Sequence, residues 1–136
     1  MRTVFALLVA TLALALGGCS SPGDVSRAAV TLGDSAVFSR ADLQAAADAV
    51  LVQFREFEGC TLQRLVYDEN FSTRQIALAS QPRPHEDVVV FTSQFRVGPN
   101  GQRSGLNPDS TYGAWTWTVT RADASATWTV TSWGAG

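Results

Sequence analysis

The sequence predicts an α+β domain in which one N-terminal amphipathic helix packs on a four- to five-stranded antiparallel sheet. Three observations support this class. Apolar residues recur at steps of three and four over 40–58, which is the period of a helix with one buried face. They alternate with polar residues over 88–97, as in a strand. Trp-Thr-Val-Thr occurs at 117–120 and again at 128–131, which indicates two strands of one hairpin. A helix followed by strands is typical of α+β domains.

The helix has recognisable signals at both ends. Ser39 fits the N-cap, and Asp42 three residues later completes a capping box. Gly59 is a natural left-handed C-cap. We therefore expect a helix over about 40–58, with a buried face made of Leu43, Ala46, Ala47, Val50, Phe54 and Phe57.

Strands account for the rest of the domain. Residues 61–67 are a first candidate, and 74–79 a weaker second, before two prolines interrupt the chain. Residues 88–97 alternate strongly and predict a third strand. A long loop rich in Gly, Pro and Asn follows over 98–113.

The final hairpin has a predicted register. If Arg121 pairs with Ala126 across a four-residue loop, Trp117 lies opposite Val130. The apolar side chains then share one face and the threonines the other, so a slip of one residue would destroy the sorting. By the same alternation, Trp133 falls on the threonine face.

The N-terminal residues have the parts of a secretion signal. Arg2 precedes an apolar stretch over 4–16, and Gly17-Gly18-Cys19 follows. This order resembles the lipobox of bacterial lipoproteins. The resemblance implies that residues 1–18 are a signal peptide and that Cys19 carries a diacylglyceryl group with palmitate-type chains. It places the protein on the cell membrane, lipid-anchored, at the extracytoplasmic face. An ordinary signal peptide, with Cys19 left as a plain thiol, is the alternative.

The composition of the mature chain indicates its domain organisation and limits the partners that it can bind. Residues 19–37 comprise the lipidated Cys19 and a segment rich in Ser, Gly, Asp and Ala that predicts a flexible tether, with a short strand at 28–30 as the alternative. Residues 38–136 form a single domain. Without Arg2, nine scattered arginines face twelve acidic residues. No basic stripe exists, so nucleic-acid binding is not expected.

Neither a metal nor a cofactor is expected. A lipid on Cys19 leaves Cys60 without a disulfide partner, and we expect Cys60 to be a small buried side chain between helix and strand. One His and one unlipidated Cys do not form a structural zinc set. The oxygen-bearing residues of the long loop lack the dense carboxylates of a calcium loop.

Two sets of residues are candidate sites. Tyr112 and Trp133 are a possible ligand or partner surface, because aromatic residues are enriched at binding sites. Tyr67, Asp68 and His85 are candidates for a pocket. The paired acidic residues are expected to be solvated. The sequence has no nucleophile elbow, phosphate loop or dinucleotide fingerprint, so it predicts no catalytic residue.

Several short motifs resemble a family of small, uncharacterised bacterial secreted and lipoprotein domains. They are Glu58-Gly59-Cys60-Thr61-Leu62, Tyr67-Asp68-Glu69, the stretch 106–112 and the closing Trp133-Gly134. The resemblance covers roughly 38–134 and implies no activity. More loosely, one helix before a sheet with late Trp-containing strands is similar to the nuclear-transport-factor and ketosteroid-isomerase superfamily. That resemblance implies a cone-shaped pocket, but those proteins normally have more helices before the sheet.

These observations favour a membrane-anchored extracytoplasmic lipoprotein that acts as a non-catalytic binding or interaction domain. An envelope protein or a glycan is its expected partner. The alternative is a small-ligand pocket or a weak enzyme of the cone-shaped type that uses Tyr67, Asp68 or His85. A purely structural envelope component is a third hypothesis. The sequence leaves open the ligand, the oligomeric state and the choice between inner and outer membrane.

Overall fold

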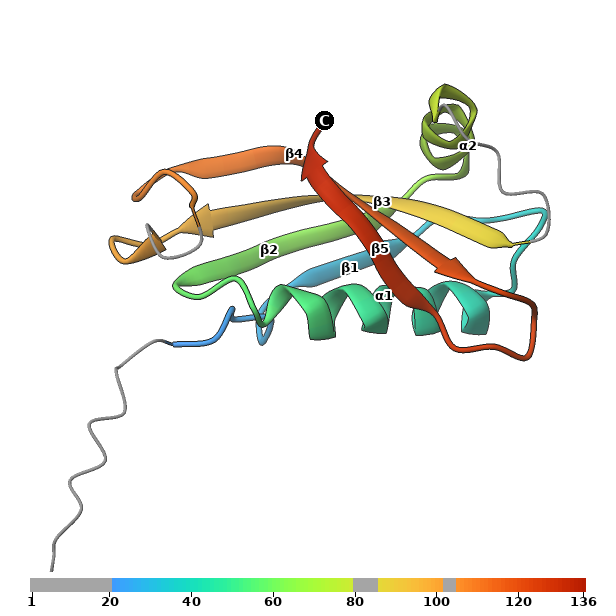
Figure 1. Ribbon diagram of the computed structural model, residues 1–136, viewed down its shortest axis with the longest axis horizontal. Coiled ribbons are helices and arrows are strands. Elements are labelled where there is room, and N and C mark those ends of the chain that lie inside the picture. The colour runs from blue at the N-terminus through green and yellow to red at the C-terminus, as the bar shows by residue number, and fades with distance from the viewer. Residues whose placement is uncertain (1–20, 80–85, 102–104) are drawn as a thin grey trace, which may run out of the picture.

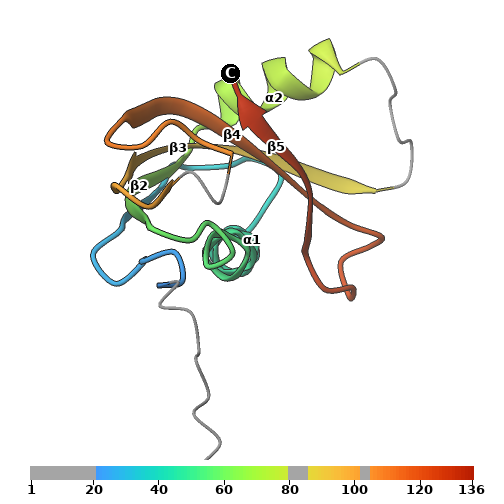
Figure 2. The same ribbon diagram turned by 60° about the vertical axis from the view of Figure 1, so that its left-hand side comes forward.

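A computed structural model describes residues 21–79, 86–101 and 105–136. One helix covers each face of a central sheet, so the described part has three layers (Figure 1 and Figure 2). The elements are β1 (Ala29–Leu32), α1 (Arg40–Phe54), β2 (Cys60–Tyr67), α2 (Glu69–Leu78), β3 (Asp87–Val97), β4 (Thr111–Arg121) and β5 (Thr129–Ala135).

The predicted α+β class is confirmed. The described residues form two helices instead of the one predicted, and the sheet is not purely antiparallel. The strands are ordered β1-β2-β3-β4-β5. β1 pairs with β2 in parallel, and the other neighbours are antiparallel, so the sheet is mixed. The strands predicted at 61–67 and 88–97 correspond to β2 and β3.

α1 begins where the sequence predicts and ends earlier. The Ser39 side chain accepts from the Asp42 amide, and the Asp42 side chain accepts from the Ser39 amide, so the capping box is present. The helix stops at Phe54, because the chain then tightens: the Phe57 amide donates to the Phe54 carbonyl at 2.9 Å. This turn brings the Phe57 ring into the core. Gly59 has a φ of +72° and ends the turn rather than the helix.

The segment 21–37 differs from the expected flexible tether. The Gly23 amide donates to the carbonyl of Arg55, and Asp24 forms a parallel bridge with Thr61. β1 then extends the sheet along β2. The composition of this segment is typical of a linker. Its order comes from backbone hydrogen bonds, which leave no periodic pattern of apolar side chains in the sequence. Cys19, the predicted lipidation site, lies outside the described residues.

The strand predicted at 74–79 is wrong, because this stretch belongs to α2. The Asp68 carboxylate accepts from the Phe71 amide at 2.8 Å and caps the helix. α2 is anchored to the sheet through Ser72, whose hydroxyl accepts from the Val90 amide at 2.9 Å. The helix has few buried side chains, and this scarcity explains why it gives no clear helical period.

The predicted hairpin register is also wrong. Val119 pairs with Val130, whereas Trp117 pairs with Trp133. The register shift between these pairs inserts Thr131 as an extra residue, a β-bulge that changes which residues share a face. Trp133 consequently lies on the apolar face and not among the threonines.

The core fills the space between α1 and the sheet. It is built from aromatic and aliphatic side chains, including those of Leu43, Val50, Phe54, Phe57, Leu62, Leu65, Phe91, Phe95, Trp117 and Val119. Cys60 lies in it with 1% of its surface exposed, as predicted for a small buried side chain. Burial raises the pKa of the Cys60 thiol.

Gly23 provides a test of whether the N-terminal segment is part of the fold. A Cβ atom at this position would lie 2.1 Å from the Phe54 carbonyl oxygen. We expect Gly23→Ala to lower the free energy of unfolding by about 1–3 kcal/mol, since the backbone must move apart. Urea denaturation of both proteins measures the difference.

Gly113→Ala is the matched control, because a Cβ there meets nothing within 4 Å. It should change stability by less than about 1 kcal/mol. If the two variants were equally stable, the segment around Gly23 would not be packed as described.

Candidate binding surface

Trp133 is a large aromatic side chain that is held firmly and remains accessible. Its ring centroid lies 5.9 Å from that of Trp117 and 6.1 Å from that of Phe57. The other side of the ring is open, with 46% of the residue exposed. The core therefore fixes the orientation of an indole that can still contact a second molecule.

Tyr112 belongs to the same cluster of rings. It stacks on Phe95 with centroids 5.2 Å apart and meets the edge of Trp115 at 5.5 Å. Trp115 in turn contacts Phe57, which contacts Trp133. The Tyr112 hydroxyl accepts from the Asn107 amide at 3.2 Å, so it holds the loop before β4. The structure connects the two predicted residues through intermediate rings, and Tyr112 has a structural task as well.

β5 is an edge strand. Within the described ranges, β4 is the strand paired with it, and its other side is unpaired. Its sequence, Thr-Val-Thr-Ser-Trp-Gly-Ala, contains neither a charge nor a proline. Edge strands in monomeric proteins commonly carry charged residues or proline, which prevent pairing with other chains. The bulge at Thr131 is the protective feature that β5 does have.

Two grooves flank this strand. On the α1 side, a groove of about 620 Å³ lies between α1 and residues 126–130. On the helix it is lined by the small or apolar side chains of Ala45, Ala49 and Val52 and by the polar side chains of Asp48 and Gln53. On the α2 side, a groove of about 720 Å³ lies between α2 and the outer face of β4 and β5. Its sheet wall includes the hydroxyl-bearing residues of β4 and β5, which are Thr116, Thr118, Thr120, Thr131 and Ser132, and also Tyr67, Asp87, Val88 and Val90.

The predicted pocket residues are only partly brought together. Tyr67 lines the α2 groove, although only 3% of its surface is exposed. Burial raises the pKa of the Tyr67 hydroxyl, and hydrogen bonds with Ser35 and Ser72 oppose that rise. Asp68 caps α2 and is not among the residues that line the groove. His85 lies outside the described residues.

Carboxylates at the α2 groove are engaged by the protein. Glu69 accepts from the Ser35 hydroxyl at 2.6 Å and from the Ala36 amide at 3.1 Å. Asp87 accepts from the Arg121 Nε at 2.8 Å. A general acid or base must exchange protons with a substrate. These two side chains instead hold together segments of the fold.

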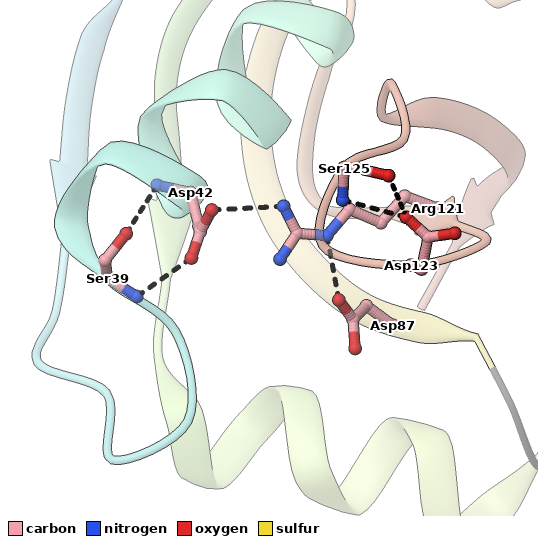
Figure 3. A network of polar contacts seen from close by, with 6 residues as sticks. All are labelled: Ser39, Asp42, Asp87, Arg121, Asp123 and Ser125. Carbon is pink, nitrogen blue, oxygen red and sulfur yellow. Dashed lines mark hydrogen bonds and ion pairs between the residues drawn. The ribbon is translucent and has the colours of Figure 1, made fainter.

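Arg121 is the centre of a polar network between the two grooves (Figure 3). It is 8% exposed, and its Nη1 lies 3.0 Å from an Asp42 oxygen, while its Nε contacts Asp87. Its guanidinium also lies 4.4 Å from the centroid of the Trp128 ring, a cation–π contact. The network joins the start of α1, the start of β3 and the end of β4.

The opposite charges of the network favour the ionised forms of Asp42 and Arg121. Hydrogen bonds with Ser39 and then with Arg121 lower the pKa of Asp42. Burial disfavours the charged guanidinium, but Asp87 and Asp42 outweigh it and raise the pKa of Arg121. A depressed carboxyl pKa is the opposite of what a general acid needs near neutral pH. The network therefore supports structure and not proton transfer.

Local sequence patterns do not predict this network. They identify Asp42 only as a capping residue, yet it also binds Arg121, which is 79 residues further along the chain. Nothing local at Arg121 indicates this pairing. Only the alignment of the start of α1 with the end of β4 brings the two together.

No family model, curated protein or solved structure matches the chain. The predicted membership in a family of small bacterial lipoprotein domains stays a prediction. None of the helices described is both long and apolar enough to cross a bilayer. Among the same residues, no three His, Cys, Asp or Glu side chains form a group that could hold a metal ion.

The Asp42 contacts predict a pH dependence. A carboxyl whose pKa is lower in the folded state stabilises the fold above its unfolded value, about 3.9, and this contribution is lost as the pH falls through the folded pKa. Asp42→Asn should be less stable than the wild type at pH 7. The difference should shrink as the pH falls below about 4.

Urea denaturation at several pH values measures this effect. Asp34→Asn is the control for the change in net charge, since Asp34 is exposed. A stability difference between wild type and Asp42→Asn that stays constant down to acid pH would contradict the assignment.

Proposed function

We propose that this protein is a lipoprotein, anchored through Cys19 at the extracytoplasmic face of the cell membrane, whose globular part is a non-catalytic binding domain. The half-exposed Trp133 on the edge strand β5 carries the second half of this proposal. The lipobox-like order Leu16-Gly17-Gly18-Cys19 supports the first half.

Trp133 has the properties of an anchor residue at an interface. Tryptophan is among the residues that contribute most to binding energy, because its ring provides a large contact area with few rotatable bonds. Contacts with Trp117 and Phe57 already fix this ring, so little conformational entropy is lost when a partner covers it.

The neighbouring backbone favours a protein partner over a glycan. An extended segment of another protein can add to β5 and satisfy its unpaired amides and carbonyls. Such a segment points alternate side chains to the two faces of the sheet. The α1 groove and the α2 groove lie on those two faces beside β5. We propose an envelope protein that presents an uncharged extended segment.

The α2 groove supports a second candidate function. Its volume of about 720 Å³ is within the range of small-molecule sites, and the predicted pocket residue Tyr67 lines it. Its hydroxyl-rich sheet wall suits a neutral polar ligand. In this alternative, α2 covers a ligand site on the outer face of the sheet, and Trp133 is peripheral.

Lipidation is tested by replacing the proposed acceptor. Cys19→Ala should move the protein from the membrane fraction to the soluble extracytoplasmic fraction or leave it as an uncut precursor. The wild-type protein should show the mass of a diacylglyceryl group on residue 19. Cys60→Ala is the control and should leave membrane attachment unchanged. A wild-type product without added lipid mass would refute the anchor.

The partner surface is tested by photo-crosslinking in intact cells. A photoreactive phenylalanine at position 133 should give one discrete protein adduct, since Trp133 is exposed. Position 78 is the control, because Leu78 is also apolar and is even more exposed, but lines neither groove. Equal labelling from 133 and 78 would count against a specific surface. A third probe at position 76 reports on the α2 groove, because Ile76 lines it. An adduct of small mass from position 76 alone would favour the α2 groove instead.

A further inference from the structure

The first described residues are joined directly to one end of the domain. The Gly59 amide donates to the Ser21 carbonyl at 3.0 Å, and the Gly23 amide donates to the Arg55 carbonyl at 2.9 Å. The Gly59 carbonyl in turn accepts from the Gly98 amide at 2.9 Å. The chain therefore enters the fold where α1 ends, β2 begins and β3 ends (Figure 1).

This entry point leaves almost no spacer before Cys19. Only one residue separates Cys19 from Ser21. Two residues of extended chain span at most about 7 Å. A lipid on the Cys19 sulfur would therefore hold this end of the domain close to the membrane surface. A flexible tether over 19–37 would have allowed any orientation, but 21–37 is part of the fold.

We infer that the end formed by residues 55–59 and 98–101 rests against the phospholipid headgroups of the bilayer that holds the anchor. The opposite end, with the start of α1, the α2 helix and the loop 122–128, then points away from the membrane. This inference rests on the proposed function, because it needs the lipid on Cys19.

The surface chemistry of this end suits headgroups and not hydrocarbon. Its exposed residues include the charged Arg55 and Glu56, the polar Asn100 and the small apolar Pro99. One large exposed apolar residue, Val52, borders this end, since its carbonyl accepts from the Arg55 amide. The other large apolar residues that are exposed in the described chain lie elsewhere: Val37, Ile76, Leu78 and Trp133. Contact of Arg55, Glu56 and Asn100 with the polar headgroup layer costs little free energy, whereas insertion into the hydrocarbon would bury a charge.

The orientation also leaves the proposed partner surface accessible. Trp133 pairs with Trp117, which is six residues along β4 from Thr111 at the membrane-facing end. Six strand residues span about 20 Å along β4, but the Trp133 ring also lies 6.1 Å from that of Phe57 at the membrane-facing end. The polar layer on each side of a bilayer is only about 6 Å thick. Trp133 would therefore lie just above the headgroups, where its exposed face can contact a partner near the membrane.

Energy transfer from the protein to the bilayer tests this orientation. The full-length chain is expressed so that it is processed, and the mature lipoprotein is reconstituted into phosphatidylethanolamine and phosphatidylglycerol vesicles with an acceptor dye on the headgroups. A donor dye is attached through an azide-bearing amino acid at position 100 or at position 124, both of which are exposed. Transfer should be at least about twofold greater from position 100, because the fifteen residues of α1 separate the two ends by about 22 Å.

A spacer variant provides the matched control. Inserting a flexible Gly-Ser segment between Ser20 and Ser21 should bring the two transfer values together, because the domain can then tumble. Equal transfer from both positions without the spacer, or more from position 124, would overturn the inference while the anchor stands. A reconstituted protein whose mass lacks the lipid would overturn the proposed anchor, and the orientation with it.

Discussion

The packing of the Phe57 ring is the contact on which the rest of this structure depends. Phe57 lies just after α1, and its ring contacts those of Phe54, Phe95, Trp115, Trp117 and Trp133. It joins the helix layer to three strands of the sheet. It also supports the inner side of Trp133 and lies two residues before Gly59, where the N-terminal segment enters the fold. One ring therefore couples the proposed partner surface to the proposed membrane-facing end.

The opposite end is held by charge instead of aromatic packing. Arg121 lies between Asp42 and Asp87 and over the Trp128 ring, so a buried cation is balanced on every side. A buried guanidinium without partners would be strongly destabilising. The two clusters fix both ends of α1 on the sheet. The edge strand β5 has five exposed residues out of seven.

The sequence predicts features that are encoded over a few residues. The capping box at Ser39, the alternation in β3 and the buried Cys60 all follow from local patterns, and all are present. The parallel pairing of β1 with β2 and the bulge at Thr131 are set by contacts between distant segments, which a local pattern does not contain. The bulge had the largest consequence for the candidate site, since it moved Trp133 to the apolar face. Tyr112 and Trp133 could be grouped from the sequence as one candidate surface, but the rings of Trp115 and Phe57 that connect them could not be predicted.

The burial of Cys60 has a consequence for the chemical durability of the protein. Disulfide exchange and oxidation by peroxides both proceed through the thiolate. A thiol that is enclosed and kept protonated reacts slowly with either, so single chains are not driven into covalent dimers. A protein with an unpaired sulfur can in this way persist under oxidising conditions without a partner cysteine.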